Sequence, residues 1–281
     1  MKNIKKKIIS FLKNAKWYHT IDVPGFGKTN GVYDHNYVIK YYKFGNLKNK
    51  TCIDVGCSNG FFSFFFEKSG AKKVIAVDKV DDDGTVEIDP SQNIKSISLY
   101  KKKYQIFIKE KKVFSEIFSF FKLNSLHRLA ILKKIFKSKI VFKKQNIFEL
   151  KNQTQKFDLV FCGDLIEHLK DPISAVEILQ KLTKKKCIIS LSSSLFFMDR
   201  FKFFLKSIIQ LKSISEILSS FNSIRYLGHV SGGAFFHFSP LEFKKICLAS
   251  GFKRVIIVSK FKLLNNKTKE MNSHAIFHCF N

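Results

Sequence analysis

The chain has 281 residues, of which 45% are apolar, and this length and composition are typical of a globular protein with a sizeable hydrophobic core. They exclude a disordered chain and a miniprotein. The formal net charge of +28 comes from 50 basic and 22 acidic side chains and favours a polyanionic partner. Only four of the basic residues are arginine, however, and 32 phenylalanines accompany the lysines, a composition that A/T-rich coding also produces. Charge alone therefore does not identify a partner.

The positive charge is concentrated in one stretch. Lys and Arg exceed Asp and Glu by 14 in residues 92–156, whereas residues 17–91 carry a net charge of −1. No run of about 18 apolar residues exists, so we expect no membrane span. Lysines interrupt residues 1–16 too often for a secretory signal, and we expect a cytoplasmic protein. Six scattered cysteines without a C-x-x-C pair indicate reduced core thiols, and no metal site is expected.

Apolar strands alternate with amphipathic helices from residue 51 onward. The pattern predicts helices over 61–69, from 172 and over 240–250, the second with Asp171 as its cap. Two consecutive strands close the chain and form a hairpin. We therefore predict an α/β fold, a Rossmann-like seven-stranded sheet that is mostly parallel, with an antiparallel C-terminal hairpin strand and helices on both faces. The predicted strands are 51–55, 73–77, 139–142, 157–162, 187–191, 254–260 and 273–280.

The expected organisation is an N-terminal basic helix and cap over residues 1–50, followed by the main domain over 51–281. Two segments, at about 92–138 and 195–226, are too long for simple connections and are predicted to be insertions, with an extra helix in 101–122. Each is expected to pack a phenylalanine face on the core. The alternative is a substrate lid or a membrane-surface contact.

The most informative run joins the first strand of this pattern to the first helix. Its sequence, Ile-Asp-Val-Gly-Cys-Ser-Asn-Gly-Phe over residues 53–61, places glycines at 56 and 60. Such a turn lets a ligand approach the backbone, and the following helix aims its first amides at the same place. The spacing is neither the G-x-G-x-x-G of dinucleotide sites nor a phosphate loop with its lysine. A nucleotide-like cofactor is expected at this strand end.

The run Asp-x-Gly-x-Ser-x-Gly resembles motif I of the class I S-adenosylmethionine-dependent methyltransferases, with serine in place of the middle glycine. Further along the chain, Asp78 ends the second strand, Gln-Asn-Ile-Phe follows the third, and Cys-Gly ends the fourth. In that family these places contact the ribose, the adenine and the methionine end of the cofactor. The resemblance therefore implies S-adenosyl-L-methionine as cofactor. Its implied contacts are Asp54, Gly56, Cys57, Ser58, Gly60, Asp78, Asn146, Ile147, Cys162 and Gly163.

Two narrower resemblances suggest different methyl acceptors. Residues 17–80 are similar to the branch that includes the tRNA wobble-uridine methyltransferases and carboxymethyltransferases. Trp17, Tyr18 and His19 could then cover the cofactor or stack on a planar substrate, or else anchor the N-terminal helix. Residues 229–251 are similar to a segment of small-molecule and sugar methyltransferases.

The function that follows is a methyltransferase, with O-methylation of a small metabolite or sugar-like acceptor as the leading hypothesis. The alternatives are a tRNA-modifying enzyme, whose basic insertion would hold the phosphate backbone, and a cofactor-binding regulator without catalysis. Methyl transfer from a sulfonium is an in-line displacement that mainly requires alignment, and a hydroxyl acceptor also requires a base. His168, His229 and His237 are the candidate bases, the last two in a glycine-rich segment expected to cover the site.

Overall fold

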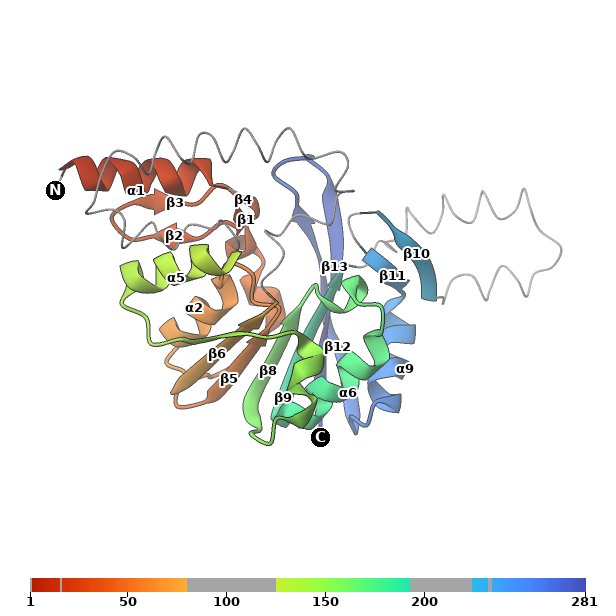
Figure 1. Cartoon of the computed structure of the whole chain (residues 1–281). Coiled ribbons are helices and arrows are strands. Elements are labelled where there is room, and N and C mark those ends of the chain that lie inside the picture. Colours follow the sequence, from red (N-terminus) through yellow and green to blue (C-terminus); the bar gives the residue numbers. More distant parts are fainter. Residues whose placement is uncertain (1, 16, 80–124, 193–223, 232–233) are drawn as a thin grey trace, which may run out of the picture.

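One mixed sheet of seven strands organises the computed structural model, which describes residues 2–15, 17–79, 125–192, 224–231 and 234–281 (Figure 1). The strand order is β12-β13-β9-β8-β5-β6-β7. Strand β13 runs antiparallel to both neighbours, and the remaining neighbours pair in parallel. The predicted fold class is confirmed. The strands are β5 Thr51–Val55, β6 Lys73–Asp78, β7 Val141–Lys144, β8 Phe157–Gly163, β9 Thr183–Ser192, β12 Arg254–Leu264 and β13 Met271–Phe280.

Strand boundaries differ from the prediction where lysines flank an apolar run. Strand β9 begins at Thr183, four residues before the predicted start, because the pairing of β8 with β9 begins at Phe157 and Thr183. Strand β7 lies two residues later than predicted, at the edge of the sheet, where charged side chains are tolerated. Pairing with a neighbouring strand, rather than local hydropathy, sets these ends.

Helices cover both faces of the sheet (Figure 1). Helices α2 (Phe61–Lys68) and α5 (Ser125–Phe136) pack on one face, which we call the α2 face. Helices α6 (Pro172–Leu182) and α9 (Pro240–Ala249) pack on the opposite face, the α6 face. The Asp171 carboxylate caps α6 by accepting a hydrogen bond from the Ser174 amide at 3.0 Å, as predicted. Side chains of successive strand residues alternate between the two cores.

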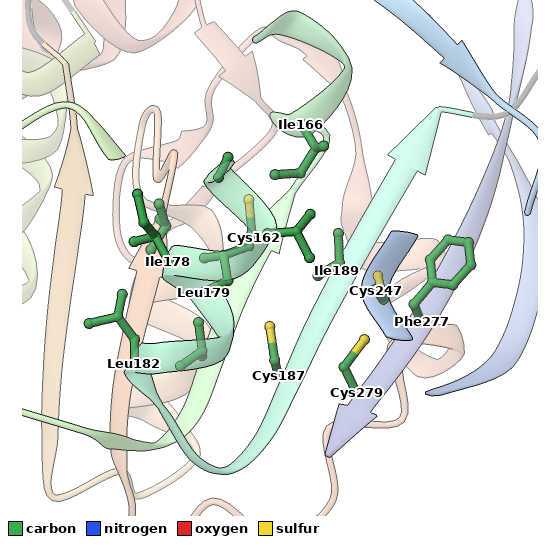
Figure 2. Packing of buried hydrophobic residues seen from close by; sticks show 14 of the residues in the cluster. Cys162, Ile166, Ile178, Leu179, Leu182, Cys187, Ile189, Cys247, Phe277 and Cys279 are labelled. Carbon is green, nitrogen blue, oxygen red and sulfur yellow. The ribbon is translucent and has the colours of Figure 1, made fainter. Parts of the chain in front are cut away.

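Cysteines contribute to both cores. Figure 2 shows the α6-face core, which contains Cys162, Cys187 and Cys279 from three adjacent strands, with Cys187 and Cys279 near Cys247 of α9. All six cysteines are buried and free, as the sequence predicts. Burial raises the pKa of the Cys162 thiol well above its usual value, which favours the uncharged form.

The N-terminal segment forms a layer at the carboxyl edge of the parallel strands (Figure 1). We call residues 2–15 and 17–42 the N-terminal layer. The Tyr18 amide donates to Asn59 Oδ1 at 2.7 Å and so joins the layer to the turn after β5. Its elements are α1 Lys2–Asn14, β1 Trp17–His19, β2 Asp22–Val23, β3 Gly27–Lys28, β4 Gly31–Tyr33, and the short 3-10 helices η1 His35–Tyr37 and η2 Ile39–Tyr42.

A second hairpin, β10 (Ile224–Ser231) and β11 (Ala234–Phe238), lies between β9 and α9 in sequence. His229 and His237, which belong to the segment expected to cover the site, lie on these two strands. Phe238 of this hairpin is buried in the α6-face core.

The insertions are only partly described. Helix α5 belongs to the first, whereas the helix predicted over 101–122 and residues 195–223 lie outside the described residues. Within the described ranges, no helix is long and apolar enough to cross a membrane.

Candidate functional site

The turn between β5 and α2 adopts a backbone that explains its sequence. Gly56, Ser58 and Gly60 have φ values of 80°, 47° and 84°, in the left-handed region that favours glycine. A Cβ on Gly56 would lie 3.0 Å from Leu165 Cδ2, and one on Gly60 would lie 2.8 Å from Leu129 Cδ1. Both glycines are therefore required by conformation and by space. Ser58 adopts the same conformation at the place where the methyltransferase motif usually has glycine.

Hydrogen bonds to the neighbouring strand β6 hold this turn, which we call the glycine turn (residues 56–60). The Gly56 and Cys57 amides both donate to the Val77 carbonyl, at 2.8 and 3.1 Å. The Ser58 amide donates to Asp78 Oδ2 at 2.6 Å. The acid predicted to bind a ribose thus also stabilises the strained serine, and it lies half-buried directly beside the turn.

Asp54 lies beneath the glycine turn and is 1% exposed. Its Oδ2 accepts a hydrogen bond from Ser63 Oγ of α2 at 2.5 Å. Burial, opposed by hydrogen bonds from Ser63, raises the pKa of this carboxyl to about 7. Asp54 therefore ties the strand to the start of the helix, which is compatible with the predicted role in forming the cofactor site.

The raised pKa of Asp54 gives a pH prediction. A carboxyl whose folded-state pKa lies above its unfolded value makes the free energy of unfolding fall as pH rises between those values. Relative to Asp54→Asn, the wild type should lose about 2–4 kcal/mol between pH 4 and pH 8, measured by denaturant titration. Asp171→Asn is the control with opposite sign, because hydrogen bonds from Ser174 lower the carboxyl pKa of Asp171. Parallel stability curves for wild type and Asp54→Asn would contradict the prediction.

The segment after β7 places two amide side chains near Asp78. Asn146 Oδ1 accepts from the Phe148 amide at 3.2 Å and caps the 3-10 helix η4 (Ile147–Asn152), so the side chain assigned to adenine has a local partner. Ile147 is buried. The backbone N–H of the neighbouring Gln145 donates to the Asp78 backbone carbonyl at 3.0 Å. Gln145 Oε1 is buried without a hydrogen-bond partner among the described residues.

These residues fit an adenosine group. Gln145 Oε1 has no hydrogen-bond donor among the described residues, and an adenine amino group could supply one. The two ribose hydroxyls could donate to a carboxylate such as that of Asp78. The glycine turn lies between this acid and the end of β8, because Val55 of β5 pairs with both Val77 and Cys162. S-adenosylmethionine would therefore have its adenosine held by Asp78 and its methionine end toward β8.

The end of β8 is tightly packed. The Cys162 side chain is buried in the α6-face core, so only its backbone can face the site (Figure 2). A Cβ on Gly163 would lie 2.9 Å from Phe161 Cζ, so a larger residue there would displace the Phe161 ring. Cys57 is also buried. The site residues predicted from the sequence at β5, β6 and β8 thus come together at one edge of the sheet.

A polar cluster that the sequence analysis did not select follows directly after β8. Asp164 Oδ1 lies 3.2 Å from His274 Nδ1 of β13 and accepts from Ser190 Oγ of β9 at 2.9 Å. Glu167, in the 3-10 helix η5 (Ile166–His168), accepts from the Ser192 amide through Oε1 at 2.9 Å. We call Asp164, Glu167 and His274 the acid–histidine cluster.

The protonation states within this cluster differ. Burial and the charge of Asp164 raise the pKa of Glu167 to about 8, which favours its neutral acid at pH 7. Although burial opposes it, His274 holds the pKa of Asp164 below its usual range, so this carboxylate stays ionised. Burial lowers the pKa of His274, but Asp164 outweighs burial and raises it overall. The cluster therefore contains one carboxylate, one carboxylic acid and one histidine that titrates above its usual pKa.

Strand alternation separates the three predicted substrate residues of the N-terminal layer. Trp17 is 1% exposed and packs edge-on against Phe11 of α1, with ring centroids 5.7 Å apart, and so anchors the N-terminal helix. His19 is 4% exposed and stacks on Phe61, and burial lowers its pKa. Tyr18 points to the other side of β1 and is only partly buried, near Asp164 and Glu167. Of the three, only Tyr18 is not fully buried.

None of the three predicted catalytic histidines belongs to the acid–histidine cluster, although His168 follows Glu167 directly in η5. His168 is exposed at the end of η5. His237 is half-buried on β11, where it pairs with Arg225 of β10, and His229 lies on β10. His274, which contacts the Asp164 carboxylate, was predicted only as part of a core strand.

The fold and the glycine turn define a class I S-adenosylmethionine-dependent methyltransferase. Residues 37–256 match a family model described as "Methyltransferase domain". The chain belongs to this methyltransferase family and is an S-adenosylmethionine-dependent methyltransferase. No curated protein matches the chain.

Solved structures of methyltransferases share the fold at low sequence identity. An S-adenosylmethionine-dependent methyltransferase from Mesorhizobium loti is 10% identical, with a TM-score of 0.50, and the match covers 87% of this chain and 97% of that one. The N-terminal domain of EvdMO1 with S-adenosylhomocysteine bound is 10% identical, with a TM-score of 0.56 and coverages of 99% and 96%. The same domain in the presence of S-adenosylhomocysteine and D-fucose is 9% identical, with a TM-score of 0.54, and the match covers 100% of this chain and 97% of that one. These likenesses extend over nearly the whole chain.

Proposed function

We propose that this methyltransferase transfers a methyl group to a hydroxyl oxygen of a small, sugar-like acceptor. The observation that carries the proposal is the acid–histidine cluster at the end of β8. Two of its atoms, Glu167 Oε2 and His274 Nε2, are buried without a hydrogen-bond partner among the described residues. Leaving buried polar atoms unpaired is costly, and hydroxyl groups of a ligand could pair with both.

The position of the cluster supports this proposal. Asp164 directly follows the strand end toward which the methionine part of the cofactor would extend, and Tyr18 lies above it from the N-terminal layer. A displacement at an activated methyl needs an aligned nucleophile and little water, and buried polar groups provide both conditions. The EvdMO1 domain, which shares this fold, was crystallised in the presence of D-fucose, a 6-deoxyhexose. A sugar is therefore a reasonable acceptor class to test.

The tRNA alternative depends on the basic stretch 92–156, of which the structure describes only residues 125–156. None of the described contacts favours RNA over a small acceptor. We therefore retain RNA as an outcome of the test. A cofactor-binding regulator without catalysis is likewise one of the outcomes that the test distinguishes.

The test is incubation of the wild type with radiolabelled S-adenosylmethionine and three kinds of acceptor: free hexoses and 6-deoxyhexoses, nucleotide-linked forms of these sugars, and bulk tRNA. We expect label in the sugar fraction that resists mild alkali, because methyl ethers survive conditions that hydrolyse methyl esters. Gly56→Val is the control that should abolish transfer.

Three results would contradict the proposal. Label in tRNA, with binding that weakens steeply between about 50 and 200 mM salt, would support the RNA-modifying alternative. Label released by alkali would identify a carboxylate acceptor. Cofactor binding without label in any fraction would favour the regulator.

A further inference from the structure

His274 and Asp164 form a buried pair outside the glycine turn. Their side chains are 4% and 8% exposed, and His274 Nδ1 lies 3.2 Å from Asp164 Oδ1. The second ring nitrogen, Nε2, is buried and has no hydrogen-bond partner within the described ranges. Because Nδ1 faces a carboxylate, its hydrogen stays there, and Nε2 is the nitrogen with a lone pair for an incoming proton.

The surroundings hold the histidine in this orientation. The Phe261 ring of β12 stacks on the His274 ring, with centroids 5.3 Å apart and an interplanar angle of 10°. Ser190 holds Asp164 through two hydrogen bonds: its hydroxyl donates to the carboxylate oxygen Oδ1, and its backbone carbonyl accepts from the Asp164 backbone N–H at 3.0 Å. A ring with one nitrogen fixed and the other unpaired is preorganised to accept a proton.

The His274–Asp164 pair also lies on the side of the glycine turn opposite to Asp78, where the reacting end of the cofactor is expected. Asp78 marks the adenosine end of the site on β6, and Asp164 follows β8, on the other side of β5. The Leu165 side chain, next to Asp164, covers Gly56. The reacting end of a bound methyl donor would thus be directed toward the histidine.

We propose that His274, oriented by Asp164, is the general base of the methyl transfer. This inference rests on the proposed hydroxyl acceptor. The acceptor oxygen forms its bond to the methyl carbon while the carbon–sulfur bond breaks, and that bond's electron pair stays on sulfur, which becomes a neutral thioether. The hydroxyl proton moves to His274 Nε2, and Asp164 stabilises the resulting imidazolium. The proton then passes to solvent after product release.

Several ionisable groups face this pair and must be included in any pH interpretation. Glu167 of η5 interacts with both members, and its neutral acid can donate a hydrogen bond to a second acceptor hydroxyl. The N-terminal layer contributes Tyr18, His19, Tyr33, His35 and Tyr42, all within electrostatic reach of Asp164. The buried Cys162 thiol of β8 is also within electrostatic reach of Asp164.

The first arm of the test needs no acceptor. Nitrogen NMR of histidine-labelled protein, saturated with S-adenosylhomocysteine, would follow the titration of His274, assigned with His274→Asn. We expect Asp164→Asn to raise the proton-dissociation constant of His274 about tenfold or more. His278 is the matched histidine on the same strand, where Nε2 contacts the Tyr42 carbonyl at 2.8 Å. A His274 titration that Asp164→Asn leaves unchanged would overturn the pairing.

The second arm compares His274→Asn with His278→Asn in methyl transfer to the sugar fraction. We expect the His274 variant to lose kcat by about 100-fold or more and to lose the rise of kcat with pH, while its affinity for S-adenosylhomocysteine stays within about threefold of wild type. The His278 variant should retain the rise of kcat with pH. Equal kcat values for His274→Asn and wild type would overturn the base assignment.

The two proposals fail in different ways. If the wild type labels no hydroxyl acceptor but His274 titrates as expected, the acceptor proposal is wrong and the base assignment falls with it, while the pairing with Asp164 stands. If sugars are labelled equally by wild type and His274→Asn, only the base assignment is wrong.

Discussion

Replacement of Gly56 by valine is expected to abolish binding of S-adenosylmethionine while the sheet remains folded. Gly56 has a φ of 80°, and its missing Cβ would lie 3.0 Å from Leu165 Cδ2. A branched side chain in this region is strained by about 1–2 kcal/mol and would also displace Leu165. Because the turn must then leave its conformation, we expect affinity to fall by about 100-fold or more, as measured by isothermal titration calorimetry.

Gly251→Val is the matched control for this substitution. Gly251 has a φ of 100° and follows α9, outside the glycine turn, with Gln180 as its nearest neighbour at 3.5 Å. The control should lower the free energy of unfolding by a similar strain but leave cofactor affinity within about threefold of wild type. If both variants bind the cofactor equally well, the glycine turn is not the binding site.

Asp78→Asn is expected to weaken S-adenosylmethionine binding by about 1–3 kcal/mol, or roughly 5- to 150-fold. The amide can still accept the hydrogen bond that the Ser58 amide donates to Asp78 Oδ2. The asparagine variant lacks the second acceptor oxygen and the negative charge of the carboxylate. The ribose hydroxyls would use both for hydrogen bonding. Asparagine therefore tests ribose recognition with the least damage to the turn.

Asp158→Asn is the control for Asp78→Asn. Asp158 Oδ2 accepts two hydrogen bonds from Thr51 at the opposite end of the sheet, both at 3.0 Å. We expect unchanged cofactor affinity in this variant, with a loss of stability alone. Affinity unchanged in Asp78→Asn as well would remove Asp78 from the site.

Local sequence determined the core of the fold and most of the cofactor site. The run from Asp54 to Gly60 joins a buried strand to a helix, and its two glycines indicate a tight turn. The local sequence therefore predicts a ligand-binding turn without information on tertiary contacts. Asp78 ends the next strand and meets the same turn because parallel strands end at one edge. The glycine turn and Asp78 can therefore be predicted from the spacing of residues along the sequence.

The acid–histidine cluster depends instead on long-range pairing. His274 meets Asp164 because β13 pairs with β9 and β9 pairs with β8, with His274 opposite Ser192 and Gly163 opposite Ser190. The available signal was alternation: Asn272, His274 and His278 share one face of β13, and the opposite face is apolar from Ala275 to Cys279. Polar residues on a central strand need partners. Local pattern alone could not identify Asp164 as the partner.

The most direct test of the account is a crystal structure with S-adenosylhomocysteine. We expect the adenine near Gln145 Oε1, the ribose hydroxyls on Asp78, the glycine turn against the ligand, and the homocysteine end directed toward Asp164 and His274. A ligand whose adenosine lies at the β8–β9 end, away from Asp78, would contradict the assignment of the site and of its reacting end.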